Sequence, residues 1–467
     1  MTRWRRITSL AIATSLAAYI ALVVIDQRNG TLRASSTLST LLVLGVAAIA
    51  FLFAAFVNER APVSMQTIWL AALAFRITVA FTSPTLSDDV YRYIWDGHVT
   101  GEGVSPYAYV IEDPALDRIT IPERDLANNP NLSSPYLPAA HAIFTATDLV
   151  LGPSTLSIRL VMIVFELGAA FLVVQLLVAT GVRSSRSLLY LWNPLVIVEI
   201  AHGAHIDAAM TMLTLAALSA TLRRPAAHWT VAPLTLAAAT LTRPIPLLLV
   251  PIVWWLWSNR QRAAYAAVCA AAIAPFGLAS GWGLGDSTDG TGVFGSARVY
   301  SESFFFNSAT YNWLHHHLGG YTDDPGRAAR IVAVIGMVVV LAAVAKRARD
   351  IRDPLAVMRL AVVPIAAYVL LTPILHPWYL VLLAALVPFL APVMNEPTER
   401  WFLLAPWMLL MVIVPLSYLT YREADVFDEL ASVRYIEWLP TYGLLMVAFA
   451  TSSRPPQSST VPENISR

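Results

Sequence analysis

The chain has 467 residues, of which 57% are apolar and only 13% are charged, and its mean hydropathy is +0.61. Soluble globular chains carry about 25% charged residues, so the composition excludes that class and indicates an integral membrane protein. The 31 basic and 30 acidic side chains nearly cancel, which argues against a nucleic-acid partner held by an overall basic field. Cys269 is the only cysteine, so the sequence excludes an intrachain disulfide framework and a thiolate metal cluster.

Apolar runs follow one another along most of the chain. A helix needs about 20 mainly apolar residues to cross the hydrocarbon core, and about fourteen runs approach that length. The predicted spans are 7–25, 36–57, 64–81, 156–180, 187–201, 206–222, 229–242, 245–257, 263–282, 328–345, 355–373, 377–393, 401–420 and 435–451. If the runs near Pro194, Pro244 and Pro246 are broken or re-entrant, the count falls to about twelve or thirteen. The predicted fold is an all-α integral membrane protein, a polytopic helical bundle over residues 1–451, whose first run is an uncleaved signal anchor.

The charged residues between the runs predict the orientation of the chain. With the N-terminus in the cytoplasm, the cytoplasmic loops hold 17 basic and 6 acidic residues, and the opposite side holds 10 and 23. Basic residues favour the cytoplasmic side of short loops, so we expect this orientation. The Pro/Ser-rich residues 452–467 then form a disordered cytoplasmic tail.

Two segments on the predicted outer side, 82–155 and 283–327, are much longer than a hairpin. The first carries ten acidic residues and three arginines. A loop of this length without its own structure is unusual. We therefore expect short amphipathic helices in it, lying along the outer interface.

The stretch SDDVYRYIWDG, residues 87–97, directly follows the third run. Its adjacent carboxylates, Asp88 and Asp89, are followed by Tyr91, Arg92 and Trp95. A carboxylate at the membrane boundary is partly desolvated, which tunes its proton affinity while a polar acceptor can still reach it. The alternative is that the acidic residues cap a helix which the aromatic residues anchor at the interface. Both interpretations remain open at this point.

A second polar group lies in WNPLVIVEIAHGAHIDAAM, residues 192–210. It places Glu199, His202, His205 and Asp207 in one outer turn. The histidine spacing makes a metal site conceivable, but it is not a recognised zinc signature. A polar turn without a ligand is the alternative, and we expect no metal.

Two further outer turns carry Arg243, in LTRPIP, and His376, in LHPWY together with Trp378 and Tyr379. Burying a lone guanidinium at membrane depth costs at least about 2.5–3.5 kcal/mol, so Arg243 needs a partner. A phosphate would match its planar fork of donors, and a carboxylate such as Asp207 would also serve.

All these polar groups project to the same side under the predicted orientation. A transporter should instead place ionisable groups near the midplane, where Arg76 and Glu166 are the only good candidates and are more plausibly structural. We predict that Asp88 and Arg243 open into one outer cavity.

Taken in order, these motifs resemble the membrane-embedded glycosyltransferases of the GT-C fold, in particular bacterial polyprenyl-phosphate-mannose-dependent mannosyltransferases. The resemblance rests on SDDVYRYIWDG with SPYAY, on WNPLVIVE with GAHIDA, on LTRPIPLLLVP and on LHPWYL, and it extends over residues 88–380. It implies an inverting transfer of a hexose, by likeness mannose, from a polyprenyl-phosphate sugar to an envelope glycan or glycolipid. The implied location is the outer face of the plasma membrane, with membrane lipid as the surroundings.

The resemblance also implies roles for individual residues. Asp88 would be the general base and Asp89 would support it or orient the acceptor. Donor phosphate binding falls to Arg243, His376 and His205. The implied sugar and lipid groove comprises Tyr91, Arg92, Trp95, Asp207, Trp378 and Tyr379. No cofactor is expected, and a divalent metal is possible but not favoured.

Two alternatives to this enzyme remain. One is a transporter or flippase for a lipid-linked sugar that uses the same outer cluster for binding only. The other is a degenerate relative that binds polyprenyl phosphate without turnover.

Overall fold

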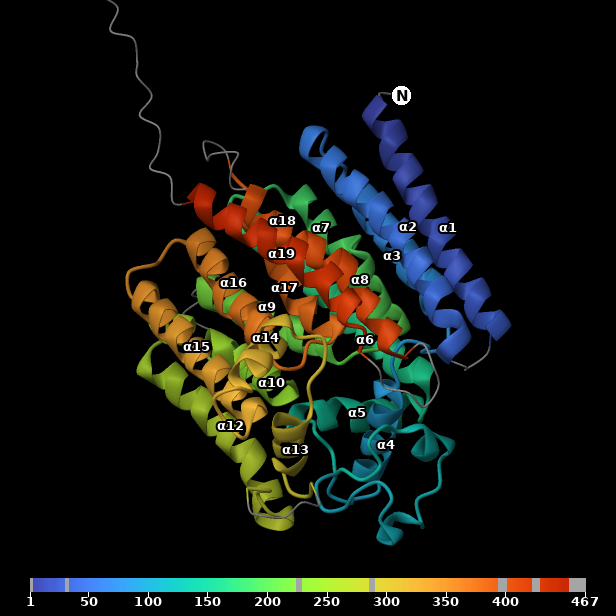
Figure 1. Ribbon diagram of the computed structural model, residues 1–467, viewed down its shortest axis with the longest axis vertical. Helices are drawn as coiled ribbons and strands as arrows, with labels where there is room; N and C mark the ends of the chain where they lie inside the picture. The colour runs from blue at the N-terminus through green and yellow to red at the C-terminus, as the bar shows by residue number, and fades with distance from the viewer. Residues whose placement is uncertain are drawn as a thin grey trace, which may run out of the picture.

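The computed structural model describes residues 3–29, 33–223, 229–284, 290–393, 401–421 and 429–452. The regular structure of these residues is helical, and their one isolated β-bridge pairs Phe306 with Ile374. Figure 1 shows the long helices side by side in a bundle, with α4 (Asp89–Gly101), α5 (Pro138–Leu151) and α13 (Gly295–Ser303) at one end. The N-terminus lies at the opposite end. The predicted all-α polytopic architecture is confirmed.

Seven helical segments of the described chain are long and apolar enough to cross a membrane. They are α1 (Arg3–Asn29), α2 (Arg33–Arg60), α6 (Thr155–Ala179), α12 (Asn259–Ser280), α15 (Pro325–Ala348), α16 (Pro354–Leu371) and α18 (Trp401–Ile413) with its continuation Val414–Tyr421. Shorter apolar helices coincide with three further predicted spans: α3 (Met65–Val79), α10 (Val231–Thr242) and the segment Pro377–Leu390, which contains α17 (Val381–Leu386). The last predicted span coincides with α19 (Ala431–Ser452). A total of about 12–14 crossings stays a prediction.

Of the three remaining predicted spans, 206–222 coincides with the continuous helix α9 (Asp207–Arg223), and the other two are broken helices. Residues 187–201 form α7 (Leu188–Leu191), α8 (Pro194–Ile197) and a π-helical turn, Val198–His202. This segment meets α9 at a bend of 119°. Within residues 245–257, the α-helical part is limited to α11 (Val250–Val253). Proline lacks the N–H that continues a helix, which accounts for the interruptions near Pro194, Pro244 and Pro246.

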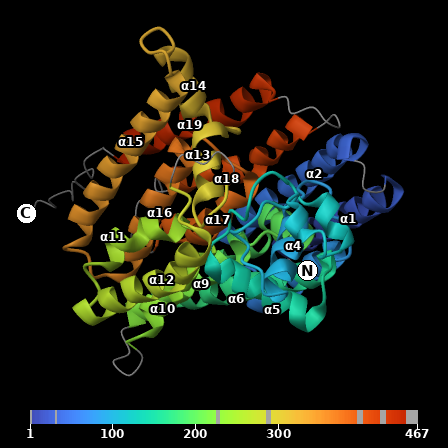
Figure 2. The ribbon, with the colours of Figure 1, turned by 90° about the horizontal axis from the view of Figure 1, so that it is seen from below.

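Short helices occupy both long outer segments. The first contains α4 and α5, joined by two 3-10 turns, and the second contains α13 and α14 (Ala309–Leu318). In Figure 1, α13 lies between the α4–α5 pair and α12, and the view from below in Figure 2 shows it displaced from them towards α14. The predicted tail falls outside the described residues from 453 onward.

Glycine brings α4 and α5 into close contact. A Cβ added at Gly97 would lie 2.8 Å from the carbonyl carbon and oxygen of Phe144. One turn away, Tyr93 stacks on the Phe144 ring with centroids 4.7 Å apart. The absence of a side chain at Gly97 therefore sets the spacing of the two helices, and with it the position of the aspartates at the start of α4.

The two ionisable side chains predicted at midspan pair with each other. Arg76 donates from Nε to Glu166 Oε2 at 2.5 Å and from Nη2 to Oε1 at 2.7 Å, and its Nη1 donates to the Leu191 carbonyl. Both side chains are buried. Their contacts join α3, α6 and the broken segment, as expected of a structural pair.

Candidate active site

A cavity of about 290 Å³ lies at the end of the bundle that carries α4 and α13. It is lined by Leu86, Ser87, Asp88, Asp89, Asn128, Asn129, Pro135, Tyr136, Arg243, Tyr300, Phe304, Phe305, Phe306, Ile374, His376, Trp378, Tyr379 and Tyr421. These residues come from both long outer segments, from the turns at 243 and 376, and from the end of Val414–Tyr421. The prediction that Asp88 and Arg243 share one cavity is confirmed.

The aspartate pair is held by an amide that the sequence did not single out. Asn128 donates from Nδ2 to Asp88 Oδ1 at 3.0 Å and to Asp89 Oδ1 at 2.9 Å. Asp88 occupies the N-cap position of α4, but its side chain makes no capping hydrogen bond. The capping interpretation is therefore wrong for Asp88, whose carboxylate lines the cavity.

Burial and, next in size, the neighbouring negative charge of Asp88 raise the pKa of Asp89 to about 6. Arg243 and the hydrogen bond from Asn128 act in the opposite sense. Tyr93 lies 3.4 Å from Asp89 Oδ2 and can donate to it through its hydroxyl. Asp89 thus protonates near pH 6, well above the ordinary aspartate pKa of 3.8.

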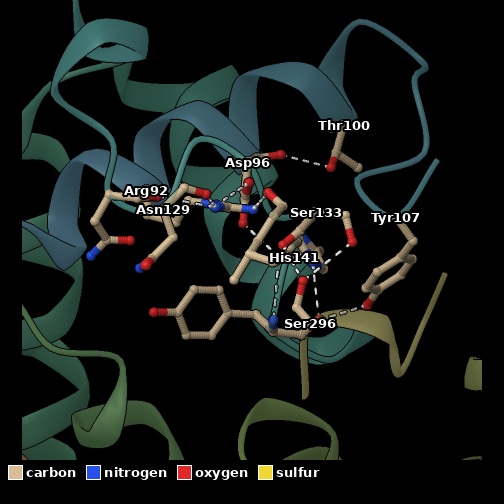
Figure 3. Close-up of polar contacts among 12 residues, drawn as sticks. Arg92, Asp96, Thr100, Tyr107, Asn129, Ser133, His141 and Ser296 are labelled. Atoms are coloured by element: carbon tan, nitrogen blue, oxygen red, sulfur yellow. Dashed lines mark hydrogen bonds and ion pairs between the residues drawn. The ribbon is translucent and has the colours of Figure 1, made fainter. Parts of the chain in front are cut away.

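Arg92 holds the loop that carries Asn128 in place (Figure 3). Arg92 is buried and donates from Nε to Asp96 Oδ1 at 3.0 Å. Its other nitrogens reach the carbonyls of Asn128, Asn129 and Leu132. The implied place of Arg92 in the sugar groove is wrong, because its guanidinium is used to shape the loop behind the cavity.

Further contacts in the same region fix the rest of this loop (Figure 3). Ser134 donates to Asp96 Oδ2 at 2.5 Å, and Ser133 donates to the Gly290 carbonyl at 2.7 Å. Asn129 donates to the Tyr300 hydroxyl at 2.7 Å, which ties the loop to α13. The cavity wall is therefore continuous between the two outer segments.

Trp95 and Tyr91 also lie away from the cavity lining. Trp95 is 2% exposed and packs in a small core with Val99 and Leu116, with the Arg124 guanidinium 5.2 Å above its ring. Tyr91 packs against the same core. Neither residue is among those that line the cavity, so the structure does not place them in the groove.

The cationic side of the cavity is Arg243, at the end of α10. Its Nη1 donates to both carboxylate oxygens of Asp207 at 2.9 Å, and its guanidinium lies 4.7 Å from the Tyr379 ring. Asp207 is completely buried and does not line the cavity, whereas Arg243 does. Of the two partners considered for Arg243, the carboxylate is present and holds the arginine in place.

Four aromatic rings form a stack beside Arg243. The His205 and Trp378 centroids are 3.9 Å apart, those of Trp378 and His376 are 4.3 Å apart, and those of His376 and Phe306 are 4.6 Å apart. Phe306 is fixed by backbone hydrogen bonds, donating to the Pro373 carbonyl and accepting from the Leu375 N–H. His205 lies behind Trp378 and does not line the cavity.

His376 is neutral at physiological pH, because burial and the nearby Arg243 lower its pKa to about 3. Its Nδ1 has no hydrogen-bond partner among the described residues. Arg243 is the only cationic side chain among the described cavity residues. His376 therefore adds no positive charge to the cavity.

The described residues contain no group of three or more His, Cys, Asp or Glu side chains arranged to hold a metal ion. Independence of metal stays a prediction for the protein.

A family model described as alpha-(1->6)-mannopyranosyltransferase, N-terminal domain, matches residues 8–259, more than half of the chain. The chain belongs to this mannosyltransferase family. A search of curated proteins finds no match. The matched region includes both aspartates, the turn from Glu199 to Asp207, and Arg243. The chain is a mannosyl-transferring glycosyltransferase, in agreement with the resemblance seen in its motifs.

Proposed function

We propose that this mannosyltransferase moves mannose from a polyprenyl-phosphate donor to a hydroxyl group of an envelope glycan or glycolipid, with inversion at the anomeric carbon. We place the reaction at the outer face of the plasma membrane. The observation that carries the proposal is the cavity itself, because it sets an aspartate pair and a single arginine around one space. A proton acceptor and a cation are the two groups that a phosphate-leaving displacement needs.

In the proposed reaction Asp88 takes the proton of the acceptor hydroxyl. The acceptor oxygen forms a bond to the anomeric carbon as the bond from that carbon to the phosphate oxygen breaks. The electron pair of the broken bond stays on the lipid phosphate, where Arg243 offsets the growing negative charge. One displacement inverts the anomeric carbon and needs no covalent enzyme intermediate.

The cavity walls suit the two halves of such a donor. Tyr379 lines the cavity with an aromatic ring, and sugar C–H surfaces pack well on such rings. Trp378 offers only its ring edge, because His205 and His376 cover its two faces. Phe304 and Phe305 line the cavity while remaining 37% and 44% exposed. An apolar edge of this kind favours an isoprenoid chain entering beside the charged groups.

The transporter and the degenerate binder remain the competing proposals. A transporter is less well supported, because the two midspan ionisable residues are paired with each other. A binder without turnover is less well supported, because the Asp88 carboxylate faces the cavity and does not cap its helix.

The test is transfer of radiolabelled mannose from a polyprenyl-phosphate donor by purified protein in lipid, within a screen that includes glucose and arabinose donors. We expect Asp88→Asn to lower the rate by about 10²–10⁴-fold, the range of general-base assistance. Glu102→Gln, at an exposed carboxylate on the same helix, is the matched control and should keep the wild-type rate.

The base assignment is wrong if Asp88→Asn and Asp89→Asn both keep full activity. Movement of lipid-linked sugar across the bilayer, with no product from any donor, would instead support the transporter.

A further inference from the structure

Glu199 is a buried carboxylate that the proposed transfer does not use. It is 2% exposed, and its Oε2 accepts a hydrogen bond from the Tyr418 hydroxyl at 2.8 Å. The same oxygen lies 3.4 Å from His205 Nε2. Among the described residues, no arginine or lysine forms an ion pair with Glu199.

The backbone of this turn is shaped to bring Glu199 and His205 together. The His205 N–H donates to the Glu199 carbonyl at 3.2 Å, after the π-helical turn Val198–His202. Ala204 has a φ of 60°, in the left-handed region that is uncommon for alanine. A Cβ at Gly203 would lie 3.0 Å from His205 Nε2. Strained backbone and π-helical turns are frequent at functional sites, and here they place an imidazole against a carboxylate.

His205 joins Glu199 to the aspartate pair. Its ring is completely buried and stacks on Trp378, with Nε2 toward Glu199 and Nδ1 3.8 Å from Asp89 Oδ2. Neither ring nitrogen makes a hydrogen bond of normal geometry within the described residues. The other titratable groups around the Glu199–His205 pair are His202, Asp207, Arg243, His376 and Tyr418.

Burial requires Glu199 and His205 to be neutral as a pair, because an isolated charge in this place would lose its hydration without compensation. The neutral pair holds two protons. One lies between the Glu199 carboxyl and His205 Nε2, and the other is on His205 Nδ1. The opposite tautomer would turn the Nδ1 lone pair toward the Asp89 carboxylate, which is repulsive. The tautomer of a histidine is generally set by the group that faces its other nitrogen.

We infer that Glu199 is a positioning residue that holds a proton on His205 Nδ1, so that His205 donates to Asp89 and keeps the aspartate pair ionised. The inference rests on the proposed function, in which that pair must be ionised to take up the acceptor proton. A shift of less than about 1 Å would bring Nδ1 and Asp89 Oδ2 within hydrogen-bond distance. Glu199 acts through His205 and does not touch the substrate.

The first test reads the tautomer without any substrate. Protein labelled with ¹⁵N-histidine is examined in lipid by solid-state NMR, and the His205→Phe spectrum identifies the His205 signals. The expected result is a proton on Nδ1 in the wild type and a shift toward Nε2 in Glu199→Leu. A wild-type proton on Nε2 overturns the inference, whatever the activity of the protein.

The second test compares two substitutions at Glu199 in mannose transfer. Glu199→Leu should move the acid limb of the kcat/KM profile upward by about one pH unit, because it removes a hydrogen bond that favours ionised Asp89. Glu199→Gln should restore the wild-type limb, because its amide can donate to Nε2 and keep the Nδ1 proton. Tyr418→Phe is the control, since it leaves Glu199 against His205, and should not move the limb.

A purely structural role for Glu199 would lower activity in both variants without a shift of the acid limb, and that result would overturn the inference. Glu199→Met serves as the second apolar variant if the leucine disturbs folding. Absence of transfer by the wild type contradicts the proposed function alone, because the NMR measurement still decides the tautomer.

Discussion

At the scale of single residues, the site consists of three charged side chains around one small cavity. Asp88 and Asp89 face Arg243 across a cavity of about 290 Å³, and Asn128 holds one oxygen of each aspartate. Asp207, which lies outside the cavity, forms an ion pair with Arg243 and offsets part of its positive charge. Small changes in the hydrogen bonds to the aspartates should therefore change the pH range of transfer.

The pKa of Asp89 makes the first residue-scale prediction. Burial and Asp88 raise it to about 6, above the ordinary 3.8, so the carboxyl gains its proton as the pH falls through about 6. Mannose transfer should lose activity in that range, as measured by kcat/KM against pH. Asn128→Ala removes a donor to the ionised form, so the pKa of Asp89 should rise and the acid limb should move up by about one pH unit. If Asn128→Ala leaves the acid limb at its wild-type pH, the group whose titration limits transfer is not one of the two aspartates.

Several residue roles could be predicted from sequence, and others could not. The convergence of Asp88 and Arg243 followed from their placement at the ends of apolar runs. Arg92 was misplaced although its partner Asp96 stands four residues on, at the spacing that pairs side chains on one helix face. Asn128 gave no signal, because its position depends on a loop whose carbonyls fold around the buried Arg92.

At the scale of elements, the predicted spans and the observed helices agree where a run is apolar and free of proline. Residues 187–201 and 245–257 form short helices instead of continuous ones, because their prolines interrupt the helical hydrogen bonding. The 119° bend between His202 and Asp207 could not be predicted, because it depends on the close approach of Gly203 to His205 and on the left-handed backbone of Ala204. This bend carries Glu199 and His205 toward the start of α4.

The contact of α4 with α5 gives the element-scale prediction. Gly97→Ala would place a methyl group 2.8 Å from the Phe144 backbone, which cannot yield as a side chain can. We expect a loss of about 1–3 kcal/mol in the free energy of unfolding, together with reduced transfer as α4 moves. Thermal unfolding of the purified protein in detergent measures the first effect.

Gly101→Ala on the same helix is the matched control, because its nearest neighbour would be 3.5 Å away. It should unfold no earlier than the wild type, since alanine favours a helix more than glycine does. Equal losses in the two variants would contradict the close contact at Gly97.

At the scale of the whole molecule, the cavity is built from two parts of the chain. Residues 8–259, which match the family model, supply the aspartates, Asn128 and Arg243. The later part supplies Phe306, the rings at 376–379 and α13. The N-terminus and the α4–α5 pair lie at opposite ends of the bundle (Figure 1), in keeping with the orientation predicted from the basic residues.

The proposed transfer requires the cavity to open away from the cytosol, and a cysteine-labelling measurement tests this most directly. The single native thiol is removed by Cys269→Ser, and a new one is placed at the exposed Glu112, in the same loop as Asn128, by Glu112→Cys. Arg347→Cys, at an exposed site near the end of α15, is the control for the predicted cytoplasmic side. In intact cells a membrane-impermeant maleimide should label Glu112→Cys fully and Arg347→Cys only after the membrane is opened. Labelling of Glu112→Cys only in opened cells would contradict an outer-face mannosyltransferase.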